Sequence, residues 1–92
     1  MKEIFKLARE IYKITATFPR SEEYGLTSQM RRPAVSITSN FTEGATRNGS
    51  KEFKQSLNIA QGSISELDAQ IELATMLNYI ENDVHESTMT KM

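Results

Sequence analysis

Hydrophobic residues recur every three or four positions along most of this chain, which is the spacing of amphipathic helices. In the first stretch they are Ile4, Leu7, Ala8, Ile11, Ile14 and Phe18. Pro19 comes next, and proline continues a helix poorly because it lacks the backbone donor. We therefore predict a helix over residues 2–18. Residues 20–25 have the length of a connection between two antiparallel helices.

The next apolar stretch predicts a second helix over residues 26–46, with Pro33 inside it. Its core-facing stripe consists of Leu26, Met30, Ala34, Ile37 and Phe41. At about 100° per residue, six polar positions fall beside that stripe: Gln29, Arg32, Ser36, Asn40, Glu43 and Arg47. A helix that only covers a core needs the apolar stripe alone. The polar stripe therefore indicates a second specific neighbour.

The longest regular pattern predicts a third helix over residues 50–78. Its steps of four and three are typical of helix bundles and coiled coils. The core-facing positions are Phe53, Leu57, Ala60, Ile64, Leu67, Ile71 and Ala74, followed by Leu77 or Asn78. A second side of this helix carries Glu52, Ile59, Gly62, Ser63, Glu66, Gln70, Leu73 and Leu77.

Two residues on that second side carry specific expectations. We expect Glu66 to pair with Arg32 or Arg47, because a guanidinium and a carboxylate can form two parallel hydrogen bonds. We expect Gly62 to lie at a close contact, because glycine lets two backbones approach and otherwise weakens a helix. These positions predict a polar network between helices or between subunits. Its members are Gln29, Arg32, Ser36, Asn40, Glu43, Gly62, Ser63 and Glu66.

A fourth helix is predicted to begin near residue 84 and to include residues 84–92. It would be about 13 Å long at about 1.5 Å per residue, against about 42 Å for the third helix. The predicted fold is all-α: one domain over residues 1–92, an antiparallel up-down four-helix bundle whose fourth helix is truncated.

The composition and motifs of the chain exclude most kinds of catalytic and metal-binding site. The chain has no cysteine, so a disulfide framework, a thiolate nucleophile and a cysteine-type zinc site are excluded. Its one histidine, His85, follows Asn82 by three positions, so the Glu-x-x-His pairs of di-iron bundles cannot form within one chain. Phosphate-binding loops and nucleophile elbows are also missing from the sequence. We predict no enzyme activity, no cofactor and no metal site.

Charge is unevenly distributed along the chain. The net charge is −1, yet residues 2–54 hold ten of the eleven lysines and arginines and six of the twelve acids. This asymmetry favours head-to-tail or cross-helix pairing within an assembly. No apolar run approaches the roughly 20 residues of a membrane span, and we expect a cytoplasmic protein.

Several motifs resemble the bacterial four-helix-bundle family encoded in intervening sequences of 23S rRNA genes. They are residues 24–32 (YGLTSQMRR), Val35-Ser36-Ile37, Ser39-Asn40, Glu43-Gly44 and residues 50–53 (SKEF), with Leu57, Ala60, Gly62-Ser63 and Glu66-Leu67. The first helix adds Ile11-Tyr12, Thr15 and Phe18-Pro19. Pro33 stands where that family usually has alanine, and Thr38 where it often has proline.

The resemblance implies a small bundle that assembles into a ring, typically a homopentamer, with a link to rRNA genes or nucleic acid. It also implies a fold relation to accessory proteins of diversity-generating retroelements, which form pentamers and bind nucleic acid. Compared with the family, the usual leader and most of the fourth helix are missing, which suggests a truncated product.

Two functions follow as hypotheses. The first is a self-associating bundle that contacts rRNA or other nucleic acid weakly through Arg20, Arg31, Arg47, Lys51 and Lys54. The alternative is a purely structural or protein-binding oligomer with no nucleic-acid role. The two differ in what these cations and Arg32 do. An exposed cluster would favour the first, whereas pairing with Glu43, Glu52 and Glu66 would favour the second.

Overall fold

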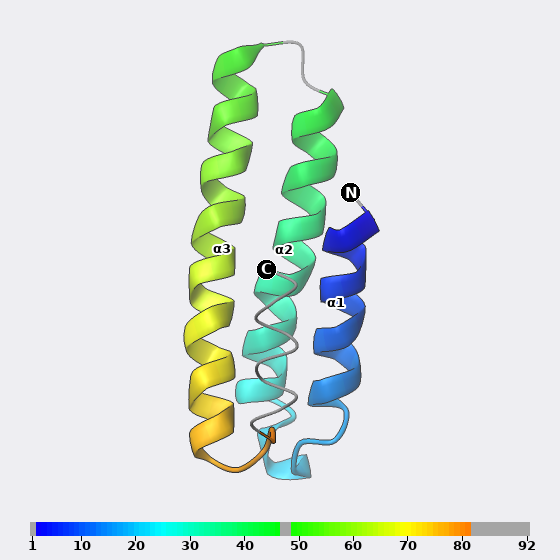
Figure 1. Cartoon of the computed structure of the whole chain (residues 1–92), viewed down its shortest axis with the longest axis vertical. Coiled ribbons are helices and arrows are strands. Elements are labelled where there is room, and N and C mark those ends of the chain that lie inside the picture. Colours follow the sequence, from blue (N-terminus) through cyan, green and yellow to red (C-terminus); the bar gives the residue numbers. More distant parts are fainter. Residues whose placement is uncertain (1, 47–48, 82–92) are drawn as a thin grey trace.

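The chain folds into antiparallel helices, as the hydrophobic pattern predicts. The computed structural model describes residues 2–46 and 49–81. In this part of the chain it has the α-helices α1 (Lys2–Thr15), α2 (Leu26–Thr46) and α3 (Ser50–Met76), and the 3-10 turn η1 (Arg20–Glu22). Each helix runs antiparallel to the one before it (Figure 1). The predicted second helix is confirmed at both ends, with Pro33 inside it. The predicted fourth helix lies outside the described residues.

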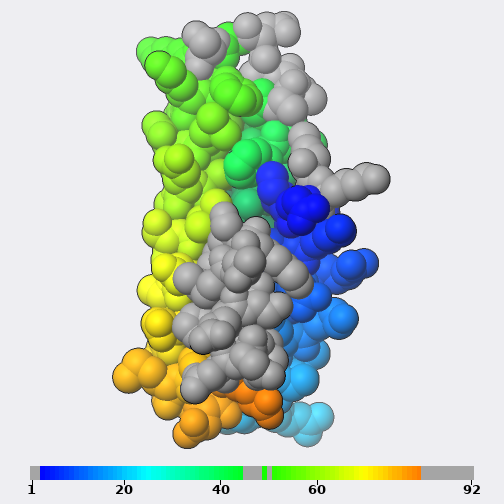
Figure 2. Space-filling model, in the orientation of Figure 1, coloured from blue at the N-terminus to red at the C-terminus, as the bar shows by residue number. Residues whose placement is uncertain are grey.

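α2 is the central helix, because both α1 and α3 pack against it. The molecule is elongated, with extents of 43 × 26 × 18 Å. Figure 2 shows α3 along the whole of one edge, whereas α1 reaches only part of the way up the other. The side chains of the hydrophobic core are Leu7, Ile11, Phe18, Leu26, Met30, Ala34, Ile37, Leu67, Ile71, Ala74 and Ile80. All but Ile80 belong to the predicted apolar stripes.

The upper part of α3 is less covered than the pattern implies. Phe53 is a core-facing position in the predicted seam, yet 43% of it is exposed. Phe53 lies in the first turn of α3, and the start of α3 extends beyond the end of the shorter α1 (Figure 1). There it packs beside Gly44 of α2, where an added Cβ would come within 3.5 Å of its ring and 3.3 Å of the Ser56 Cβ. Gly44, rather than Gly62, is therefore the glycine at a close helix contact.

The first helix is shorter than predicted, because its last turn is replaced by other hydrogen bonds. The Thr15 hydroxyl donates to the Ile11 carbonyl at 2.7 Å. The backbone N–H groups of Thr17 and Phe18 bond to the carbonyls of Ile14 and Thr15, three residues back. Phe18 also precedes a proline, which disfavours helical backbone at that position. The helix ends at Thr15, although Phe18 remains buried in the core.

The third helix ends at Met76 rather than at residue 78, because Asn78 adopts the left-handed conformation with φ of 65°. The Tyr79 N–H bonds to the Ala74 carbonyl at 2.9 Å, and the Asn78 N–H bonds to the Thr75 carbonyl at 3.0 Å. This pair of bonds is the Schellman motif, in which glycine is the usual left-handed residue.

Asn78→Gly is therefore expected to raise the free energy of unfolding by about 0.5–1 kcal/mol, because glycine adopts positive φ without steric cost. Urea denaturation measures this change. The matched control is Asn58→Gly, at an exposed position inside α3, where the same substitution should lower stability by about 0.3 kcal/mol. Destabilisation by Asn78→Gly would contradict the left-handed assignment.

A side-chain junction fixes the turn after α3 to the start of α2. The Tyr79 hydroxyl donates to Glu22 Oε2 at 2.9 Å. The other carboxylate oxygen, Oε1, accepts from the Leu26 N–H at 3.1 Å. The Tyr79 ring lies on Phe18, with ring centroids 5.2 Å apart. One carboxylate thus caps α2 and holds the chain that leaves α3.

The hydrogen bond to Glu22 raises the pKa of Tyr79 above its ordinary value of 10.0, and burial and the carboxylate charge add to this. A raised pKa means that the bond stabilises the fold fully below pH 10 and loses this effect as pH rises through the folded-state pKa. We expect the stability difference between the parent chain and Tyr79→Phe to shrink above pH 10. Urea denaturation of both proteins from pH 7 to 11 measures it. A constant difference would contradict the bond.

Candidate functional site

Three of the predicted network residues meet at the junction of α2 and α3. The Ser63 hydroxyl donates to the Ser36 hydroxyl oxygen at 3.1 Å. The Asn40 side-chain amide donates to that same oxygen at 3.1 Å and to the Ser36 carbonyl at 2.8 Å. All three side chains are partly buried. At Ser36 and Asn40, the polar neighbour predicted for α2 is therefore α3 of the same chain.

A second polar contact lies further down the same junction. The Gln70 amide donates to the Gln29 backbone carbonyl at 3.1 Å. The Gln70 Oε1 atom is buried and has no hydrogen-bond partner within the described part of the chain. The Gln29 side chain is exposed. Buried acceptors are rarely left unpaired in native proteins. The Gln70 Oε1 atom therefore lacks the hydrogen-bond donor that such an acceptor usually has.

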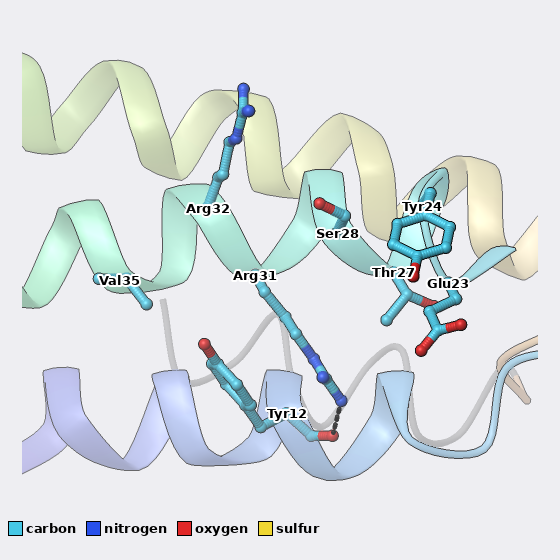
Figure 3. A pocket seen from close by; sticks show the side chains of 8 residues that line it. All are labelled: Tyr12, Glu23, Tyr24, Thr27, Ser28, Arg31, Arg32 and Val35. Carbon is cyan, nitrogen blue, oxygen red and sulfur yellow. Dashed lines mark hydrogen bonds between the residues drawn. The ribbon is translucent and has the colours of Figure 1, made fainter.

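Arg32 and Glu66, one of the two expected ion pairs, do not pair with each other within the described part of the chain. Both side chains are exposed. In Figure 3, Arg32 points away from α1. Arg47, the other expected partner of Glu66, lies outside the described residues. Glu43, a further member of the predicted network, is exposed on α2.

Gly62 is likewise exposed, and a Cβ added there would meet no atom within 4 Å. The expected close contact at Gly62 is therefore not made inside the chain. Gly62, Glu66 and Arg32 instead lie on surfaces that a second molecule can reach.

These residues belong to a row along the exposed side of α3, which we call the α3 outer face. Ile59 is 46% exposed, Leu73 is 48% exposed and Met76 is 76% exposed. The row advances in steps of three and four, as the core seam does. Its members are Ile59, Gly62, Glu66, Ala69, Leu73 and Met76, and Ala69 is also exposed. The sequence analysis missed Ala69 and Met76, although the regular spacing from Ile59 was available as a signal.

Arg31 binds within the chain and is not the free cation that the nucleic-acid hypothesis needs. Its Nε donates to the Thr15 hydroxyl oxygen at 2.9 Å, and its Nη2 donates to the Tyr12 carbonyl at 3.2 Å. The guanidinium carbon lies 4.5 Å from the centre of the Tyr12 ring. Arg31 thus places a positive charge at the carboxyl end of α1, where the helix dipole favours it.

The other predicted cations do not form one cluster. Arg20 lies in η1, at the end of the bundle where α2 begins. Lys51 and Lys54 lie in the first turns of α3, at the end where α2 finishes (Figure 1). All three side chains are exposed, but they are separated by the length of the bundle. Arg47 lies outside the described residues.

Two adjoining hollows lie along α1 and the first half of α2, and together we call them the α1–α2 hollow. Their volumes are about 500 and 410 Å³, and Glu23, Thr27 and Arg31 line both. Figure 3 shows the larger one, with Tyr12 on α1 facing Arg31 on α2. Tyr24 is 92% exposed at its rim. The sequence analysis did not select either tyrosine for a site, because an isolated aromatic residue has no periodic signal.

The described residues hold no group of three or more His, Cys, Asp or Glu side chains that could bind a metal ion. None of the helices in this part of the chain is both long and apolar enough to span a bilayer. His85 lies outside the described residues.

Comparison with known families gives one match that covers the whole chain. Residues 1–92 match the family described as 23S rRNA-intervening sequence protein. No curated protein matches the chain.

Proposed function

Because the chain belongs to the 23S rRNA-intervening sequence protein family, we propose that it is a non-enzymatic bundle that self-associates through α2 and the α3 outer face. The observation that carries this proposal is the α3 outer face itself. A regular apolar row against which no helix of the described residues packs is typical of an interaction surface rather than of a solvated helix face.

The spacing of that row indicates the kind of partner. Ile59, Leu73 and Met76 follow the three-and-four pattern that packs one helix against another at a shallow angle. Gly62 and Ala69 lie between them and let a second helix approach closely. A helical partner fits this surface, and another copy of the chain supplies one.

Charge favours a second copy over an unrelated partner. Arg32 on α2 and Glu66 on α3 are both exposed and do not pair with each other inside the chain. If Arg32 of one copy meets Glu66 of the next, the two exposed charges pair between copies. Such a head-to-tail contact is heterologous, and it closes into a ring when its rotation allows. The family resemblance favours a ring of five.

Size-exclusion chromatography with light scattering tests this proposal. The monomer mass is 10.4 kDa, and we expect a homogeneous species of several times that mass at micromolar concentration. A monomer throughout the micromolar range would overturn the proposal. A dimer or tetramer would keep self-association and exclude the pentamer.

Contact with nucleic acid is the second candidate function. It is supported by the family's association with rRNA genes. The cations Arg20, Lys51 and Lys54 are exposed but lie at opposite ends of the bundle, so neighbouring subunits would have to bring them together. Because one subunit is slightly acidic overall, binding should be weak and should need several subunits. We expect dissociation constants of about 10⁻⁴ to 10⁻⁶ M that increase steeply with salt. Filter binding to an rRNA hairpin, from about 50 mM salt upward, measures this, and failure to bind at low salt would leave self-association alone.

A further inference from the structure

The α1–α2 hollow has an excess of positive charge on a chain whose net charge is negative. Arg31 and Arg32 line its larger part, and Arg20 lines its smaller part. Glu23 is the acidic residue among the side chains that line it. The Arg31 guanidinium is already bonded to α1, and Arg32 points away from α1 (Figure 3). Arg20 is therefore the arginine of the hollow that can bind an anionic ligand.

The same hollow also presents aromatic rings. Tyr24 is almost fully exposed, and Tyr12 is 42% exposed. The Tyr12 ring is already fixed on one side by Arg31, whose guanidinium carbon lies 4.5 Å from its centre. An acidic peptide would need the cations but not the flat rings. A ligand that carries both a negative charge and a planar ring uses every feature of the hollow.

We propose that the α1–α2 hollow binds single-stranded nucleic acid, with a base stacked on Tyr24 and a phosphate held by Arg20. This inference rests on the second candidate function and assigns it a site and a form of ligand. Aromatic stacking beside a basic groove is the general mode of single-strand binding, because every base has a flat face and every nucleotide a phosphate.

The geometry favours a single strand over a duplex or a free nucleotide. Bases inside a duplex are stacked on one another, so their flat faces are not available to a surface tyrosine. The hollow consists of two adjoining parts that share Glu23, Thr27 and Arg31. A strand of several nucleotides contacts both parts, whereas a mononucleotide contacts one.

Fluorescence anisotropy with labelled ten-nucleotide oligo-U and oligo-A RNA, at about 50 mM salt, tests the site. Tyr24→Ala should weaken binding by about five- to a hundredfold, whereas Tyr24→Phe should leave it within about twofold because the ring is retained. Arg20→Ala should weaken binding and reduce the slope of log K against log salt by about 0.7. Glu23→Gln should strengthen binding, since it removes the acidic group. Arg9→Ala is the matched control, because it removes an exposed cation of α1 that does not line the hollow, and it should have a smaller effect than Arg20→Ala.

The possible results of this experiment distinguish an error in the proposed binding site from an error in the proposed nucleic-acid function. If the parent protein binds no RNA, both the nucleic-acid function and this site are wrong. If it binds but Tyr24→Ala and Arg20→Ala bind equally well, nucleic acid contacts another surface and only the site is wrong. If Tyr24→Ala changes the oligomer size measured by light scattering, the hollow is a contact between copies and the site is again wrong. Preferential binding of duplex RNA or of a mononucleotide would also overturn it.

Discussion

Glu66→Arg is expected to convert the assembled protein into smaller species, and adding Arg32→Glu should restore the assembly. In the proposed contact, Glu66 of one copy meets Arg32 of the next. The single substitution places two positive charges together, and like charges at an interface cost several kcal/mol. The double substitution exchanges the two charges and restores their attraction. Light scattering after size-exclusion chromatography measures the mass of each variant.

The structure allows a clean control for this experiment. Both side chains are exposed and unpaired with each other within one subunit, so each change should alter the subunit's own stability by less than about 0.5 kcal/mol. Gln61→Arg also introduces an arginine at an exposed position of α3, outside the α3 outer face, and the assembly should keep its size. Single variants that assemble like the parent would show that the interface lies elsewhere.

Arg31→Ala is expected to lower the free energy of unfolding by about 1.5–3 kcal/mol, which is the range for hydrogen bonds to a charged group. Arg31 joins α2 to the end of α1 through Thr15 and the Tyr12 carbonyl, and its guanidinium also stacks on the Tyr12 ring. Arg31→Lys should recover only part of the loss, because an ammonium group cannot reproduce the planar fork. Urea denaturation at one fixed protein concentration measures all three proteins.

Arg9→Ala is the matched control for Arg31, since Arg9 is an exposed cation on α1. It should change the free energy of unfolding by no more than about 0.5 kcal/mol. A similarly small effect of Arg31→Ala would mean that its hydrogen bonds contribute little in solution. Arg31 would then be free to serve as the nucleic-acid contact that the sequence suggested.

The helices and the core could be predicted from the sequence because both depend on local periodicity. α2 begins and ends at the predicted residues, and ten of the eleven core residues in the described part of the chain lie on the predicted stripes. The ends of α1 and α3 differ from the prediction, for local reasons that hydrophobic periodicity does not reveal. α1 ends early because the N–H groups of Thr17 and Phe18 bond to carbonyls three residues back, just before Pro19, and α3 ends early because Asn78 has positive φ.

The candidate sites depended on which helix faces are covered, and this was decided by tertiary structure. Arg31 and Arg32 are chemically equivalent neighbours, and both belonged to the group of basic residues considered for nucleic acid. They lie about 100° apart on α2, so packing of α1 against one side buries part of Arg31 and leaves Arg32 in solvent. For the same reason Gly44 meets α3 closely while Gly62 meets nothing within 4 Å.

The sequence by itself therefore determined the helices, their order and most of the side chains that form the core. Those properties follow from periodicity and from the conformational limits of each residue. Tertiary structure decided which polar residues bond inside the chain, as Ser36 does with Ser63, and which remain exposed, as Glu66 does. The physical reason is that a helix has a continuous circumference, and only the packing of neighbouring helices determines which part of it faces solvent.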